Sequence, residues 1–525
     1  SEYMGKYINK GNGYFKRALR SEYVDKSGLI RVMNDTLFTE NSFSCVTRCR
    51  RFGKSMAAKM LCAYYDRSCD SRDLFAGLEI ASDPTFEEHL NKYPVLYLDM
   101  TSFMTKDRNK DIVSQIDSAI RKDLSEAYPD VPMEEDDRLI DYLLTVNDRT
   151  GDMFVFIIDE WDAILREFEA EKEVIDKFVN WLRGMFKSSD GLTVFAGVYM
   201  TGILPIKKYK TESALNNFWE YSMVAPKNMA TYFGFTADEV KALAAKHGMD
   251  YNDLEKWYDG YQIGGVSQMF NPNSVMMALR EGFCQSFWSS TGAFESVADY
   301  IRLNYKGLKD DVIALLSGAH IRVNTTKFQN DMSIVRNRDE VLTVLIHLGY
   351  LTFDRTCSQC YVPNMEVEEE LRNAVEETDW NIVIDAIQQS ERLLQQTLWM
   401  NTEAVARGLD AIHSQETSIL SYNDENSLAC VISLAYYYAR NDYIIHRELP
   451  TGYGFADMVF IPRKNVDKPA LIIELKQGHS AEEAILQIHD RKYVEQVRQH
   501  TSDILLVGIN YDKESKQHTC IIEKG

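Results

Sequence analysis

The stretch TRCRRFGKSMAAKML, residues 47–61, decides the fold of the first part of the chain. Within it, Gly53, Lys54 and Ser55 come directly before an apolar helical pattern, as in a phosphate-binding loop. In such a loop the backbone N–H groups and the helix N-terminus bind the phosphates, the lysine reaches the terminal phosphates and the hydroxyl ligates magnesium. The first glycine of the usual G-x-x-x-x-G-K-S/T pattern is absent, because Arg48 occupies its position. Taken alone, the stretch indicates either a nucleotide site of unusual sequence or a chance GKS on a basic helix.

The residues around this loop alternate between strand-like and helical patterns. The apolar run MFVFIIDE, residues 153–160, is continuous, which suits a strand buried on both faces of a parallel sheet. Similar runs predict further strands at residues 42–47, 94–100 and 192–202, and a helix from Met56 to Tyr65. Strands separated by helices in this order predict a doubly wound α/β domain.

Two carboxylates, Asp159 and Glu160, end the predicted strand MFVFIIDE. A phosphate-loop ATPase needs an acid at the end of a neighbouring buried strand to hold magnesium, and a second group to activate the attacking water. Asp159 and Glu160 are the candidates for these roles, and a solvated strand end is the alternative. Thr201, at the end of another predicted strand, is either a γ-phosphate sensor or a turn residue. The strand at 94–100 precedes the acid, which fits the ATPase branch with a strand inserted between loop and acid.

Four stretches together resemble the predicted AAA-ATPase-like family of bacterial and archaeal proteins: YVDKSGLI, TRCRRFGKS, IIDEWDAIL and MTGILPI with SALNNF. The loop of that family usually reads R-P-R-R-F-G-K-S, so Arg48 is a usual residue there and Cys49 replaces a proline. The resemblance spans roughly residues 5–230 and implies ATP binding. The resulting candidate nucleotide-binding residues are Arg48, Arg50, Arg51, Phe52, Gly53, Lys54, Ser55, Met56, Asp159 and Thr201, with Ser55 and Asp159 also magnesium ligands.

A second informative stretch is GYGFADMVFIPRKNVDKPALIIELKQG, residues 452–478. Glu474 and Lys476 are two residues apart, so they leave the same face of a strand, and a short connection brings Asp457 alongside them. Two carboxylates and a lysine suit metal-assisted phosphodiester hydrolysis, in which Mg²⁺ or Mn²⁺ is held by oxygen ligands and the lysine positions or activates a water. A hairpin with polar residues facing solvent is the alternative.

The same stretch and the helix after it resemble the PD-(D/E)XK nuclease superfamily over roughly residues 416–520. Asp457, Glu474 and Lys476 match its D…E-x-K core, so the resemblance implies a catalytic and metal-binding role for them. Gln487 and Tyr493 match the Q…Y pattern of the following helix. The resemblance also implies a third carboxylate, for which Glu425 and the nearer Glu448 both stay open.

The patterns divide the chain into four parts. We predict a P-loop AAA-ATPase-like domain at 1–225, a helical lid and winged-helix-like region at 226–375, a helical connector at 376–415 and a restriction-endonuclease-like α/β domain at 416–525. The nine cysteines show no repeated spacing, which predicts reduced thiols. Cys357 and Cys360 form a single C-x-x-C, interpreted as a hairpin turn with incidental cysteines rather than a metal or redox site.

The composition, with 45% hydrophobic and 26% charged residues, is typical of a soluble globular protein. No apolar run reaches the roughly 18 residues that cross a bilayer, so we expect a cytoplasmic protein without a membrane partner. The net charge of −21 argues against indiscriminate coating of DNA, because an acidic surface repels phosphate, but a local basic groove stays compatible with it.

Two functions are compatible with these sites. In the first, ATP binding or hydrolysis licenses metal-dependent cleavage of DNA, as in mobile-element or defence systems, with RNA as an alternative substrate. In the second, ATP controls an assembly state, and the nuclease-like domain only binds nucleic acid or a partner protein. The intact set of Asp457, Glu474 and Lys476 favours the first, and the acidic net charge gives mild support to the second. The expected cofactors are ATP and Mg²⁺, with Mn²⁺ an alternative at the nuclease site, and assembly into a homo-oligomer stays open.

Overall fold

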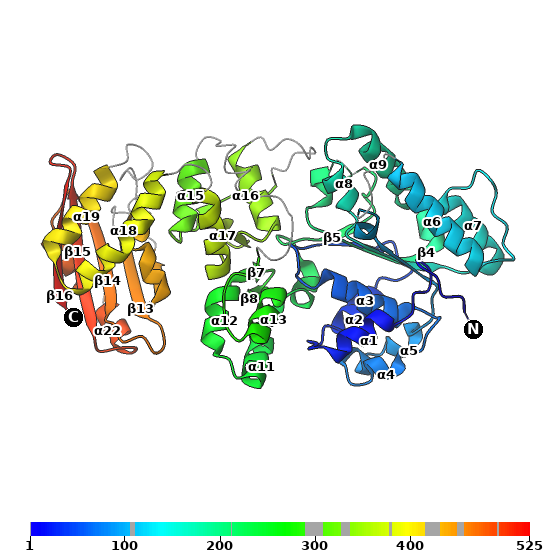
Figure 1. Ribbon diagram of the computed structural model, residues 1–525, viewed down its shortest axis with the longest axis horizontal. Helices are drawn as coiled ribbons and strands as arrows, with labels where there is room; N and C mark the ends of the chain where they lie inside the picture. The colour runs from blue at the N-terminus through cyan, green and yellow to red at the C-terminus, as the bar shows by residue number, and fades with distance from the viewer. Residues whose placement is uncertain are drawn as a thin grey trace. The chain divides into compact units, whose positions relative to one another are not determined.

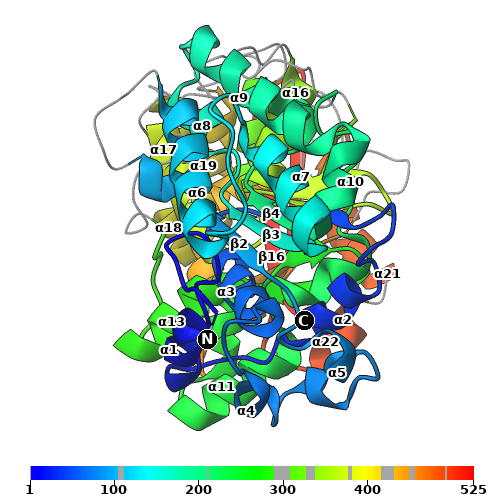
Figure 2. The same ribbon diagram turned by 90° about the vertical axis from the view of Figure 1, so that its right-hand side faces the viewer.

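Five parallel strands build the sheet that carries the phosphate loop, in the order β2-β3-β4-β1-β5 (Figure 1). The strands are β1 (Phe43–Thr47), β2 (Val95–Asp99), β3 (Phe154–Asp159), β4 (Phe195–Gly202) and β5 (Trp219–Tyr221). Every residue of β1, β3 and β4 is buried, because helices cover both faces of the sheet. In Figures 1 and 2, α1 to α3 lie on one side of the sheet and α6 to α9 on the other. The predicted doubly wound α/β fold is confirmed.

The computed structural model describes residues 2–104, 111–209, 211, 213–288, 308–326, 337–376, 381–414, 431–448, 456–490 and 493–525. The chain forms two compact units. The first comprises residues 1–290 and 323–366, and the second comprises residues 291–322 and 367–525.

The helices around the parallel sheet bury aromatic side chains against it. They are α1 (Gly13–Arg20), α2 (Gly28–Asn34), α3 (Lys54–Tyr65), α4 (Arg72–Phe75), α5 (Phe86–His89), α6 (Ile112–Ala127), α7 (Leu139–Thr150), α8 (Ala163–Glu167), α9 (Lys172–Phe186) and α10 (Ser189–Val194). Tyr64 and Tyr65 of α3 are fully buried and meet edge to face, with ring centroids 4.9 Å apart. Helix α3 itself packs against β2, β3 and β4, which holds the phosphate loop at its start beside the sheet.

The rest of the first unit contains short helices and two small sheets. Its elements are β6 (Phe235–Thr236), α11 (Ala237–His247), α12 (Tyr251–Tyr258), β7 (Tyr261–Ile263), β8 (Val266–Phe270), α13 (Pro272–Glu281), α16 (Arg338–His347), β10 (Thr352–Asp354) and β11 (Gln359–Tyr361). The strands β6, β8 and β7 pair antiparallel, and so do β10 and β11. In this part of the chain, helix α16 is followed by the hairpin of β10 and β11.

The second unit is built on a mixed sheet in the order β12-β13-β14-β15-β16. Its elements are α15 (Leu308–Leu316), β9 (Ile321–Arg322), α17 (Met365–Glu376), α18 (Asn381–Leu398), α19 (Thr402–Ser414), β12 (Tyr443–Glu448), β13 (Ala456–Pro462), β14 (Ala470–Gln477), α21 (Ala481–Asp490), α22 (Tyr493–Arg498), β15 (Ile504–Asp512) and β16 (Gln517–Lys524). Only β14 and β15 pair in parallel, and the other neighbours are antiparallel. Helix α21 packs on β14 and β15, and α19 packs on β16.

Several sequence expectations are corrected or completed by these elements. Residues 192–194, predicted to begin a strand, belong to helix α10, because the strand β4 begins only at Phe195. The strands β5 and β12 have no counterpart among the predicted strands. Cys357 lies in the turn between β10 and β11 and Cys360 on β11, and every cysteine that the structure describes is a free thiol. Within the described residues, no helix is both long and apolar enough to cross a membrane.

Candidate functional site

The phosphate loop connects the end of β1 to the start of α3. Gly53 immediately precedes α3 with a φ of +93°, and Arg51 has a φ of +63°. Space for a Cβ is open at Gly53, so its left-handed backbone is what requires glycine. These two residues turn the chain so that the N-terminus of a 12-residue helix follows the loop directly. A helix N-terminus with free N–H groups is suited to bind phosphate.

Ser55, Asp159 and Thr201 form a hydrogen-bonded line across the end of the sheet. The Ser55 hydroxyl donates to Asp159 Oδ2 at 2.7 Å, and the Thr201 hydroxyl donates to Asp159 Oδ1 at 2.5 Å. Burial raises the pKa of Asp159 above its ordinary value, although both hydroxyl bonds oppose the shift. The structure therefore brings together the two predicted magnesium ligands and the candidate sensor threonine.

Lys54 lies at the first position of α3 and is buried, with 3% of its surface exposed. Its Nζ donates to the carbonyl oxygen of Arg48 at 2.5 Å and to that of Gly202 at 3.1 Å. Burial lowers the pKa of this ammonium. The lysine charge is thus held between the two strand ends that border the loop, β1 and β4.

Glu160 has a φ of +57°, which is rare for a residue with a side chain. Its backbone N–H donates to Thr201 Oγ1 at 2.9 Å, which holds this turn against β4. Its carboxylate accepts a hydrogen bond of 2.5 Å from Arg166 Nη2 of α8. The side chain is therefore oriented by an ion pair that is mostly shielded from water, since only 13% of Arg166 and 16% of Glu160 is exposed.

Asp162 is a buried carboxylate that was not among the site residues predicted from the sequence. It accepts hydrogen bonds from the backbone N–H of Ile203 at 2.9 Å and from the Tyr209 hydroxyl at 2.8 Å, and Arg166 lies 3.5 Å away. Burial raises its pKa, but Arg166 and these hydrogen bonds outweigh burial and hold the pKa below its ordinary value. The spacing of Asp162 and Arg166, four residues apart, was the available sequence signal.

The remaining loop candidates occupy different environments. The guanidinium of Arg48 is fully buried, donates to the carbonyl oxygens of Thr47 at 2.9 Å and Tyr221 at 2.7 Å, and has its pKa lowered to about 10 by burial. Phe52 is also fully buried, whereas Arg51 is exposed. Arg50 and Met56 are half-buried. Arg48 and Phe52 therefore fasten the loop to the fold through groups that do not face solvent.

The candidate nuclease residues occupy adjacent positions of the second sheet. Asp457 of β13 is paired in register with Glu474 of β14 and with Glu448 of β12, so the three carboxylate positions form one row across three strands. Glu474 is fully buried, and Lys476 is 6% exposed. The Lys476 ammonium lies 3.4 Å from Gln487 Oε1 of α21. The register thus brings together Asp457, Glu474 and the nearer of the two third-carboxylate candidates.

A glycine sets the distance between this row and α21. Gly508 of β15 is paired with Glu474, and a Cβ there would lie 2.6 Å from the carbonyl oxygen of Ala481 and 2.7 Å from Cγ1 of Ile485. Only glycine allows α21 to pack this closely, and the close approach carries Gln487 to Lys476.

The structure describes some of the candidate nuclease residues only in part or not at all. Glu425 is outside the described residues. Tyr493 begins α22, and its side chain, like those of Asp457 and Glu448, is not described. Across the side chains that are described, no group of three or more His, Cys, Asp or Glu residues is arranged to hold a metal ion. Asp457 and Glu448, two of the three positions in the carboxylate row, are not among those described side chains.

The two sites correspond to two known families. Residues 15–211 match the predicted AAA-ATPase family, and residues 423–520 match the PD-(D/E)XK nuclease superfamily. The chain carries a predicted AAA-ATPase domain followed by a PD-(D/E)XK nuclease superfamily domain. Residues 212–422, between the two matched segments, are covered by neither family.

Whole-chain comparisons add a relative and two distant folds. An uncharacterized protein in the vnfD 5' region of Azotobacter chroococcum mcd 1 is 21% identical, over 97% of this chain and 95% of that protein. The ORC2 protein of Aeropyrum pernix, in ADPNP-ADP complexes, is 10% identical over 69% of this chain and 98% of its own, with a TM-score of 0.33. CDC6P of Pyrobaculum aerophilum is 11% identical over 71% and 96%, with a TM-score of 0.26. Likenesses this distant carry no functional inference.

Proposed function

We propose that the ATPase domain binds and hydrolyses ATP at the loop of residues 48–55. The observation that carries this proposal is the hydrogen-bonded line from Ser55 through Asp159 to Thr201. These hydrogen bonds join the start of α3 to the ends of β3 and β4, beside the N-terminus of α3. In this role Lys54 Nζ exchanges its carbonyl partners for the terminal phosphate oxygens.

The donor set at the loop fits Mg²⁺, which prefers oxygen ligands. The Ser55 hydroxyl and the Asp159 carboxylate, 2.7 Å apart, would hold the ion, directly or through water. When bound with ATP, Mg²⁺ would neutralise charge on the phosphates. Burial raises the pKa of Asp159 and so disfavours its ionised form, which a bound dication would favour.

Glu160 is proposed as the general base that takes the proton of the attacking water. The carboxylate is held by Arg166 and the backbone by Thr201, so its position is fixed before ATP arrives. Such fixed orientation is what a general base needs in order to reach a bound water. The strained φ of Glu160 is compatible with a functional site, where backbone strain of this kind concentrates.

In the nuclease domain we propose metal-dependent cleavage of DNA, with RNA as a second substrate class. Asp457 and Glu474 would hold Mg²⁺ or Mn²⁺, and Lys476, oriented by Gln487, would position the attacking water. The row of carboxylate positions and the burial of Glu474 support this assignment, since a charged carboxylate is costly to bury without a compensating charge. We propose further that ATP binding or turnover licenses the cleavage, as in mobile-element or defence systems.

The ATPase half of this proposal is tested by replacing the proposed base. Glu160→Gln keeps the size of the side chain, so ATP affinity should stay within about threefold of the wild type while turnover falls by about 100-fold or more. Glu135→Gln is the matched control, because Glu135 is an exposed glutamate of the same domain. Unchanged turnover in Glu160→Gln would remove Glu160 from the mechanism.

A further inference from the structure

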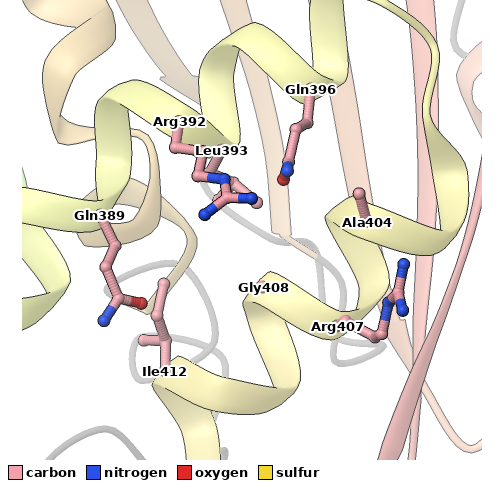
Figure 3. A pocket seen from close by; sticks show the side chains of 8 residues that line it. All are labelled: Gln389, Arg392, Leu393, Gln396, Ala404, Arg407, Gly408 and Ile412. Atoms are coloured by element: carbon pink, nitrogen blue, oxygen red, sulfur yellow. The ribbon is translucent and has the colours of Figure 1, made fainter.

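A groove of ≈ 390 Å³ lies between α18 and α19, away from both candidate sites in the sequence (Figure 3). Both helices belong to the second compact unit and to the segment that neither family match covers. We call it the arginine groove, and its lining residues are Gln389, Arg392, Leu393, Gln396, Ala404, Arg407, Gly408 and Ile412.

The groove is built by facing stripes of two helices. Gln389, Arg392 and Gln396 recur at spacings of three and four residues, so they lie on one face of α18. Figure 3 shows Arg392 and Gln396 projecting from α18 toward α19. A Cβ on Gly408 of α19 would lie 2.8 Å from Leu393 Cδ1, so the glycine lets the two helices approach at the base of the groove.

Within the part of the chain that the structure describes, the charges in the arginine groove have no partner. Arg392 and Arg407 are exposed, and within the described residues neither makes an ion pair or a hydrogen bond. A second groove, of ≈ 440 Å³ in the ATPase domain, also contains arginines, but there Arg121 binds Asp117 at 2.5 Å and Arg138 binds Asp141 at 3.1 Å.

The contrast indicates what kind of ligand the arginine groove suits. None of its eight lining residues is acidic, although the whole chain has a net charge of −21. Since the two guanidinium groups make no ion pair with the described residues, the lining of the groove carries positive charge on an acidic protein and attracts an anion. Guanidinium forks match phosphate oxygens in a bidentate manner.

We propose that the arginine groove binds the sugar-phosphate backbone of a nucleic acid strand. The choice of ligand rests on the proposed nuclease function, because α19 packs on β16 of the nuclease sheet within the same unit. Arg392 and Arg407 bind phosphates, and the carboxamides of Gln389 and Gln396 bind sugar or base atoms that offer both donors and acceptors. An acidic peptide is the competing ligand, and the test below separates it from a nucleic acid strand.

The test measures binding of a fluorescent single-stranded 30-mer DNA to the full-length protein by anisotropy, in EDTA so that no cleavage occurs. The variant Arg392→Gln/Arg407→Gln should bind about tenfold more weakly or worse at low salt. Its slope of log affinity against log salt should be shallower by about 1.4, or roughly 0.7 for each phosphate that the variant no longer neutralises. The control Lys464→Gln/Lys513→Gln removes the same charge from exposed turns of the same unit and should stay within about twofold of the wild type.

Three outcomes would overturn the inference. The first is equal affinity of the two double variants, with unchanged melting temperatures showing that both are folded. The second is an unchanged salt slope in the arginine variant. The third is arginine-dependent binding of a labelled polyglutamate peptide without binding of the DNA. Cleavage in Mg²⁺, measured on the same proteins, separates this inference from the proposed function. If nothing cleaves but binding still depends on Arg392 and Arg407, the groove stands and the nuclease proposal fails.

Discussion

Phe52 anchors the phosphate loop in a part of the first unit that is distant in sequence. Its ring is fully buried and meets Tyr261 of β7 edge to face, with centroids 5.1 Å apart. The Tyr261 hydroxyl in turn donates to the carbonyl oxygen of Gly349 at 2.8 Å, just after α16. A Cβ on Gly234 would lie 3.1 Å from Phe52 Cε1, so the ring fills the space beside that glycine. We predict that Phe52→Ala loosens the loop and weakens ATP binding.

The magnitude follows from the burial of the ring. Replacing a fully buried phenylalanine with alanine removes about 3–5 kcal/mol from the free energy of unfolding, of which the edge-to-face contact supplies about 0.5–1.5 kcal/mol. Without the ring the loop is less ordered in the free protein, and ATP binding must supply the free energy that orders it. If ordering the loop takes about 1.4 kcal/mol of the binding free energy, ATP affinity falls about tenfold.

The assay compares Phe52→Ala with Phe178→Ala by urea unfolding and by calorimetric titration of ATP. Phe178 is 1% exposed and lies on α9, where it stacks on Trp181 with centroids 6.0 Å apart. Its loss should destabilise the same domain by a similar amount without reaching the loop. If Phe52 anchors the loop, ATP binding weakens only in Phe52→Ala. Equal ATP affinities in the two variants, at similar loss of stability, would refute it.

Three further predictions concern single contacts. Arg166→Ala frees the Glu160 carboxylate and should lower ATP turnover about tenfold or more at nearly unchanged ATP affinity, so equal steady-state rates would contradict the positioning role. Burial, and to a smaller extent the charge of Arg48, lowers the pKa of His347 to about 3. Between pH 6.5 and 3, His347 therefore takes up a proton only in the unfolded chain. Stability should therefore fall as pH falls from 6.5 toward 3, by up to about 1.4 kcal/mol per unit, and urea titrations of His347→Gln should show a smaller loss. Gly508→Ala forces α21 away from β15 and should lower the free energy of unfolding by about 1–3 kcal/mol, whereas an unchanged thermal melt would argue against the close packing.

The sequence was sufficient to predict the parallel sheet, the loop and the acid pair. Runs of mostly apolar and β-branched residues identify β1 to β4, because strands covered on both faces bury the side chains of both faces. The edge strand β12 has only a short apolar run, Tyr443 to Ile445, before three polar residues, and its Ile444 is 43% exposed, so its pattern is too short to identify a strand. The predicted start of β4 is too early because Thr193 and Val194 of α10 are β-branched and run directly into the strand.

The contacts that orient the ATPase site depend on tertiary structure. The motif places Arg48 in the loop, but its burial against Tyr221 depends on β5, which the sequence pattern does not reveal. Likewise, the ion pair of Glu160 with Arg166 requires the turn at Glu160 to place α8 beside the strand end. Motifs identify the reactive groups, whereas the contacts that hold them depend on the folded backbone, here on the strand β5 and on the turn at Glu160.

The central claim is that one chain combines an ATPase with a nuclease that it controls. The most direct test is cleavage of plasmid and single-stranded DNA in Mg²⁺ or Mn²⁺, with and without ATP, by the wild type, Asp457→Ala and the exposed-residue control Asp467→Ala. We predict metal-dependent cutting that increases with ATP, persists in Asp467→Ala and disappears in Asp457→Ala. Cutting that survives Asp457→Ala, or no cutting under any condition by a protein that still binds ATP, would contradict the claim, and the second result would favour a regulatory switch.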